Sequence, residues 1–60
     1  MPFIEVKFFE GRTREQKADL ARRFTDALVE VTGCPEEAVS IAFEDFAKGD
    51  WAKSGRLCDE

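Results

Sequence analysis

Two segments of alternating apolar residues flank one segment with helical periodicity, and this order constrains the fold more than any other feature. Phe3–Phe9 alternates with period two and is rich in β-branched and aromatic side chains, which predicts a strand. Val39–Phe46 alternates in the same way and predicts a second strand. Between them, apolar residues at helical spacing run from Leu20 to Val31, within a helix predicted over about Arg14–Thr32. A strand, a helix and a strand in this order form a βαβ unit with parallel strands, so the predicted fold class is α+β.

Capping and turn signals mark the ends of these elements. Thr13 and Gln16 have the spacing of a capping box at the start of the helix. Gly33 is placed to end the helix in the left-handed conformation that glycine adopts readily. After the second strand, a turn at Lys48-Gly49-Asp50 leads to a short C-terminal hairpin predicted over Trp51–Leu57.

The chain is too short to bury a large core by itself. It has 60 residues, which we expect to form one domain over residues 1–60. A chain of this length buries only about 60% of its unfolded surface, and two strands alone are marginally stable. One helix covers one face of the sheet, which leaves Phe3, Phe9, Ala42 and Phe46 on the uncovered face. We therefore predict an oligomer in which another copy of the chain pairs with the sheet or covers this face.

Charge and residue counts argue against several classes of protein. Nine Lys and Arg against 13 Asp and Glu give a net charge of −4, whereas a nucleic-acid-binding protein of this size normally carries a basic surplus. The chain has no His and only two Cys, Cys34 and Cys58, which make a poor zinc site. No apolar stretch approaches the roughly 20 residues of a membrane helix, and the segment after Met1 lacks the features of a signal peptide. We expect a cytoplasmic protein with reduced thiols, with no metal or cofactor and no nucleic-acid or membrane partner.

Pro2 is the first candidate for chemistry. If Met1 is removed, the chain begins with a secondary amine at the head of a strand. An α-amino group has a pKa of about 7.7–8.0, and burial beside apolar residues such as Phe3 and Trp51 lowers that pKa by disfavouring the cation. Such an amine is a base near neutral pH without any His. The alternative is that Pro2 only leads the strand, a position where proline is tolerated.

Arg12 and Trp51 are candidates for substrate binding. Arg12 lies between the first strand and the helix N-terminus, where its permanent charge and the helix dipole favour a carboxylate. The alternative is that Arg12 is a solvated loop residue paired with Glu10 or Glu15. Trp51 follows a glycine turn and can either line a pocket for a flat conjugated substrate or serve only in packing.

Taken in order, these residues resemble the 4-oxalocrotonate tautomerase family, and the resemblance spans nearly the whole chain. It rests on Pro2 after Met1, on Glu10-Gly11-Arg12-Thr13 and Glu15-Gln16-Lys17 at the start of the helix, and on Ala47-Lys48-Gly49, Trp51 and Gly55. The resemblance implies a βαβ fold with a C-terminal hairpin, in which subunits pair into a four-stranded sheet. Three such dimers commonly form a hexamer, so we expect a homo-oligomer, with a hexamer favoured over a dimer.

The resemblance also implies roles for individual residues. Pro2 would move a proton between the enol or dienol form of a substrate and its conjugated ketone, Arg12 would engage a substrate carboxylate, and Trp51 would line the pocket. Ser40 stands where the better-known members have a second arginine, which binds the 2-oxo and carboxylate end. A hydroxyl there can donate one hydrogen bond but brings no charge. The expected substrate is a small anionic enol or keto acid, as in the degradation of aromatic compounds.

Two other functions stay open at this point. A cationic Pro2 could support hydration-type dehalogenation or decarboxylation, with Glu5 or Glu44 as the carboxylate that activates water. The chain could instead be a non-catalytic oligomeric subunit, an interpretation favoured by Ser40 in place of arginine.

Overall fold

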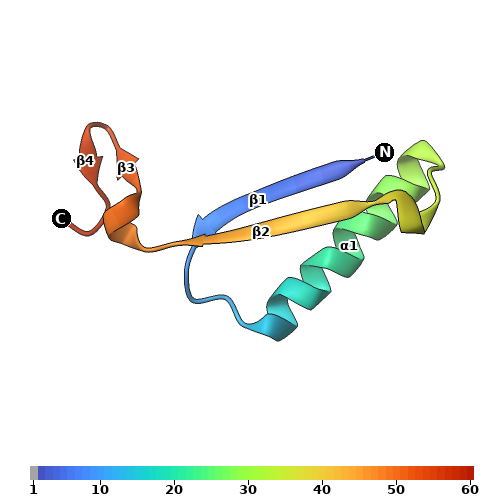
Figure 1. Ribbon diagram of the computed structural model, residues 1–60, viewed down its shortest axis with the longest axis horizontal. Coiled ribbons are helices and arrows are strands. Elements are labelled where there is room, and N and C mark those ends of the chain that lie inside the picture. The colour runs from blue at the N-terminus through green and yellow to red at the C-terminus, as the bar shows by residue number, and fades with distance from the viewer. Residues whose placement is uncertain (1) are drawn as a thin grey trace.

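The computed structural model describes residues 2–60, and its elements follow the predicted order. β1 spans Phe3–Phe9, α1 spans Arg14–Thr32 and β2 spans Ser40–Phe46 (Figure 1). A separate antiparallel hairpin of β3 (Ala52–Lys53) and β4 (Arg56–Leu57) ends the chain. The predicted βαβ unit of the α+β class, with its C-terminal hairpin, is confirmed.

Two short 3-10 helices flank β2, over Glu36–Ala38 and Lys48–Asp50. The first explains why β2 begins one residue later than predicted, at Ser40. The backbone N–H of Val39 donates to the Glu36 carbonyl at 3.1 Å, so Val39 closes a turn rather than opening the strand. The second 3-10 helix lies at the predicted turn.

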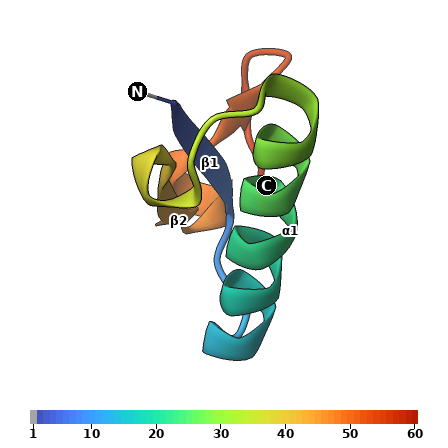
Figure 2. The same cartoon turned by 90° about the vertical axis from the view of Figure 1, so that its right-hand side faces the viewer.

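β1 and β2 are parallel and in register from Phe3 opposite Ser40 to Phe9 opposite Phe46. The stacked rings of Phe8 and Phe43, with centroids 6.0 Å apart, lie on the face that α1 covers. Lys17 of α1 reaches this face and binds Asp45 of β2 at 2.7 Å. Figure 2 shows α1 along one side of the two strands. The βαβ unit is therefore one layer of helix on one small sheet.

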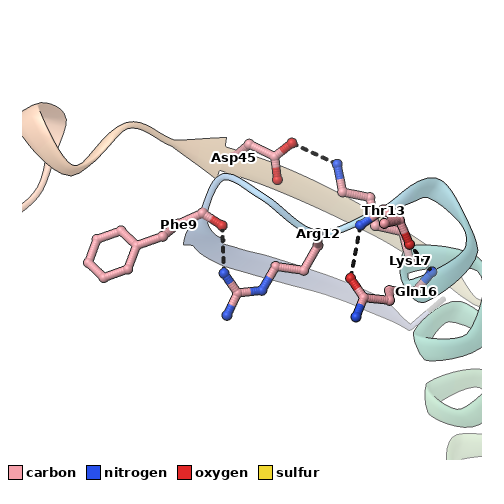
Figure 3. Close-up of polar contacts among 6 residues, drawn as sticks. All are labelled: Phe9, Arg12, Thr13, Gln16, Lys17 and Asp45. Carbon is pink, nitrogen blue, oxygen red and sulfur yellow. Dashed lines mark hydrogen bonds and ion pairs between the residues drawn. The ribbon is translucent and has the colours of Figure 1, made fainter.

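The start of α1 is fixed by the predicted capping box. The Gln16 N–H donates to the Thr13 hydroxyl at 3.1 Å, and the Thr13 N–H donates to the Gln16 side-chain oxygen at 2.9 Å (Figure 3). Gly33 ends the helix with φ 75°, a conformation that glycine adopts without steric cost. The loop before the helix, which carries Arg12, is thus anchored at its end.

Arg22 ties α1 to the segment that follows it. Its guanidinium donates to Asp26, one helical turn away, at 3.1 Å, and also to Glu36. The hydrogen bond from Arg22 to Glu36, followed by that to Asp26, raises the pKa of Arg22 above its usual value. Arg22 is therefore a structural cation on the outer surface of the helix.

No residue between 2 and 60 is buried away from solvent in the single chain. Phe3 is 62% exposed, and Val31, predicted on the apolar stripe of the helix, is 82% exposed. The radius of gyration is 14.5 Å, whereas a compact domain of this length would have about 10 Å. The described residues therefore leave much apolar surface exposed, which is typical of surfaces that bind partners.

Candidate active site

Pro2 and Ser40 lie together at the start of the sheet. Ser40 stands opposite Phe3 in the parallel register, and its backbone N–H donates to the Pro2 carbonyl at 3.0 Å. This bond fixes the backbone of the half-buried Pro2 against β2. Met1 lies outside the described residues, so its removal stays a prediction.

Arg12 lies at the opposite end of β1. Its Nη1 donates to the Phe9 carbonyl at 2.9 Å (Figure 3). Its guanidinium carbon lies 5.2 Å from the centroid of the Phe8 ring. These contacts replace the pairing with Glu10 or Glu15 considered above. No carboxylate on the described part of the chain forms an ion pair with Arg12, so its charge is available for an anion.

Trp51 shares that end of the sheet with Arg12. Its ring meets Phe9 edge-on, with centroids 5.0 Å apart, and Phe46 at 5.4 Å. Phe9 and Phe46 are opposite each other on β1 and β2, on the face that α1 does not cover. Trp51 therefore closes one end of the uncovered face and leaves part of its own ring exposed.

A single chain does not bring the four predicted site residues together. Phe3 and Phe9 are six residues apart on an extended strand, which separates the two ends by about 20 Å. Figure 1 shows the start of β1 and the C-terminal hairpin toward opposite ends of the 44 Å long axis. The expectation that Trp51 is near Pro2 is wrong within one chain.

The carboxylates considered for activating water are already engaged. Lys7 lies 3.5 Å from Glu44 and 3.9 Å from Glu5 on the uncovered face. All three side chains are about half exposed. Among the described residues, no recorded contact directs either carboxylate toward Pro2.

Two surface hollows run along α1. One of about 420 Å³ is lined by Arg14, Lys17, Ala18, Ala21 and Phe43. The other, of about 370 Å³, is lined by Ala18, Ala21, Arg22, Thr25 and Glu36. Neither contains a predicted site residue, which agrees with a site that one chain leaves incomplete.

Sequence reasoning missed two residues at the Arg12 end. Phe9 was identified only as an apolar residue of the uncovered face, but its carbonyl accepts from Arg12 and its ring contacts Trp51. Lys48, identified only within a turn and a matching motif, places Nζ 5.9 Å from the Phe9 ring centroid. The alternation of the two strands places Phe9 at the end of β1, on the same face as Phe46, and this pattern could have indicated Phe9.

Residues 2–60 hold no group of three or more metal-ligating side chains. Along the same residues, no helix combines the length and apolar character needed to cross a bilayer. Cys34 and Cys58 are both free thiols.

The fold and the Pro2, Arg12 and Trp51 positions define a short βαβ chain of the tautomerase kind, and sequence comparison agrees. Residues 2–58 match the family described as tautomerase enzyme, and the chain belongs to that family. A probable tautomerase of Bacillus cereus is 46% identical over 61 residues, covering 100% of both chains. A 2-hydroxymuconate tautomerase of Bacillus subtilis is 43% identical over 60 residues, covering 98% of this chain and 97% of the relative.

Solved structures have the same fold. The crystal structure of YwhB, a homologue of 4-oxalocrotonate tautomerase, matches with a TM-score of 0.93 at 37% identity, covering 98% of this chain and 97% of that one. A heterohexamer 4-oxalocrotonate tautomerase from Chloroflexus aurantiacus matches with a TM-score of 0.90 at 28% identity, covering 100% and 97%. The chain is thus a probable tautomerase in a family whose members include small oligomers.

Proposed function

We propose that this chain is a cofactor-free tautomerase that interconverts the enol or dienol and keto forms of small 2-hydroxy-dienoate or 2-oxo acids. The observation that carries the proposal is that Arg12, which has no carboxylate partner among the described residues, lies with the partly exposed Trp51 at the same end of β1. The 2-hydroxymuconate tautomerase named among its relatives supports this substrate class.

The free edge of β1 offers a self-complementary pairing surface. In an antiparallel pair of two identical strands, residues directly opposite each other must lie on the same face. A pairing centred on Val6 puts Glu5 opposite Lys7 of the other copy, twice in each interface. Shifting the centre by one residue either way puts Glu5 opposite Glu5, or Lys7 opposite Lys7, and like charges opposite each other are destabilising. No register at the edge of β2 pairs opposite charges, because the only charged residues of β2, Glu44 and Asp45, are acidic.

This register completes the site. It places Phe3 of one copy opposite Phe9 of the other, and Pro2 beside Glu10 of the other. Arg12 and Trp51 both contact Phe9, so both come to the Pro2 end of the paired copy. We propose that each site takes Pro2 and Ser40 from one chain, and Arg12 and Trp51 from the copy paired with it.

The chemistry follows from this grouping. After removal of Met1, the Pro2 nitrogen accepts the proton of the substrate 2-hydroxyl and returns a proton to a carbon of the conjugated chain. Arg12 holds a carboxylate, Trp51 packs against the flat conjugated system, and Ser40 donates a hydrogen bond to the other end. The guanidinium also stabilises the dienolate that forms between the two proton transfers.

We further propose a homohexamer built from three such pairs. Pairing through β1 leaves the uncovered sheet face, including the 62% exposed Phe3, still in need of cover. Association of pairs through these faces would bury it.

The test is ketonisation of 2-hydroxymuconate followed by ultraviolet absorbance. Intact mass first establishes that Met1 is absent, and Pro2→Ala is assayed beside the unchanged protein. We expect turnover by the processed protein and a loss of about 100-fold or more in Pro2→Ala. If the processed protein shows no turnover above background, the tautomerase proposal fails. Dehalogenase or decarboxylase chemistry, or a non-catalytic subunit, is then favoured.

A further inference from the structure

The end of β1 that carries Arg12 also carries a second cation. Among residues 2–60, four cationic side chains contact aromatic rings: Lys7, Arg12, Lys17 and Lys48. Lys7 is paired with Glu44 and Lys17 with Asp45. Within the described residues Arg12 and Lys48 have no carboxylate partner, which leaves two uncompensated positive charges near Phe8 and Phe9.

These two cations approach the strand end from opposite faces of the sheet. Successive side chains of a strand point to opposite faces, so Phe8 lies on the face under α1 and Phe9 on the uncovered face. The Arg12 guanidinium carbon is 5.2 Å from the Phe8 ring centroid, and Lys48 Nζ is 5.9 Å from that of Phe9. A ligand at the end of the strand would therefore have one cation on each side.

Lys48 is held in fixed relation to Trp51. The Trp51 N–H donates to the Lys48 carbonyl at 3.3 Å, which closes the 3-10 helix over Lys48–Asp50. Both side chains contact the Phe9 ring. Any assembly that brings Trp51 to a substrate brings Lys48 with it.

The other cations nearby fit this position less well. Lys53 and Arg56 stand opposite each other on the hairpin, and Arg56 lies 3.7 Å from Glu60. Neither contacts Phe9 or Trp51 through any interaction that the structure records.

We propose that Lys48 is a specificity-determining residue that binds the second carboxylate of a dicarboxylate substrate. This inference rests on the proposed function. Arg12 holds one carboxylate, and Lys48, on the opposite face of the same strand end, supplies a cation for the other. The site then prefers a dienol diacid to the corresponding monoacid.

The test compares 2-hydroxymuconate, a diacid, with 2-hydroxypenta-2,4-dienoate, a monoacid, in steady-state assays. Lys48→Met removes the charge and keeps the aliphatic length, and Lys48→Arg keeps the charge. Arg23→Met is the matched control, because Arg23 is a 76% exposed helix cation whose loss changes the net charge equally.

For Lys48→Met we expect KM for the diacid to rise about 10- to 100-fold, with kcat changed far less. Turnover of the monoacid should stay within about twofold, which also shows that the variant is folded. Lys48→Arg should restore the preference for the diacid, and Arg23→Met should leave it unchanged. Equal effects on both substrates, no effect on either, or the same effect from Arg23→Met would overturn the assignment. Failure of the proposed function has a different signature: the unchanged protein turns over neither acid, or Pro2→Ala is as active as the parent.

Discussion

At the scale of single residues, Phe9 organises the end of β1 that carries Arg12. Its carbonyl accepts from Arg12, and its ring meets Trp51 at 5.0 Å and Lys48 at 5.9 Å. One strand-terminal residue thereby positions a guanidinium, an indole and an ammonium. Because Trp51 also contacts Phe46, it joins the hairpin to both strands.

Replacing Trp51 with Ala should destabilise the protein and weaken substrate binding. It removes two edge-on aromatic pairs, at about 0.5–1.5 kcal/mol each, so we expect a loss of about 1–3 kcal/mol in the free energy of unfolding. Trp51→Phe keeps an aromatic ring against Phe9 and Phe46 and should lose less than half as much. Urea unfolding at a fixed protein concentration measures both variants. Equal midpoints for Trp51→Ala and the parent would show that these contacts contribute nothing.

At the scale of elements, most of the fold could be predicted because local signals and long-range order agree. The capping box at Thr13 and the glycine at position 33 set the ends of α1 correctly. The start of β2 could not be predicted, because alternation continues through Val39 while its N–H is used by the preceding turn. Register between β1 and β2 follows from the matched alternation of two seven-residue strands.

Reversing a charge on the β1 edge should weaken the assembly. In Glu5→Lys, the introduced ammonium would oppose Lys7 of the paired copy, and converting two attractive contacts to repulsive ones raises the dissociation concentration by about tenfold or more. Glu44→Gln is the control, since it removes a neighbour of Lys7 without changing the β1 edge. Sedimentation velocity over a dilution series measures the effect. If both variants dissociate at the same concentration, β1 does not pair in the proposed register.

At the scale of the whole molecule, the single chain lacks both a buried core and a complete site, because it is extended rather than compact. With a radius of gyration of 14.5 Å and no residue in 2–60 removed from solvent, the chain is extended around a two-stranded sheet. The sequence indicated Pro2, Arg12 and Trp51 as separate candidates, but periodicity carries no information about contacts between copies. The structure shows that Pro2 lies about 20 Å of strand away from the end of β1 that carries Arg12 and Trp51, a separation that no local pattern predicts.

The most direct test of a site shared between two chains is subunit mixing. Pro2→Ala and Arg12→Ala chains are unfolded together in equal amounts, refolded, and assayed for ketonisation of 2-hydroxymuconate against each variant refolded alone. Random pairing makes half of the pairs mixed, and each mixed pair holds one intact site and one doubly altered site. The shared-site account therefore predicts about one quarter of the wild-type activity from two nearly inactive parents. Activity no higher than the average of the two parents would contradict it, because Pro2 and Arg12 would then act within the same chain or not at all.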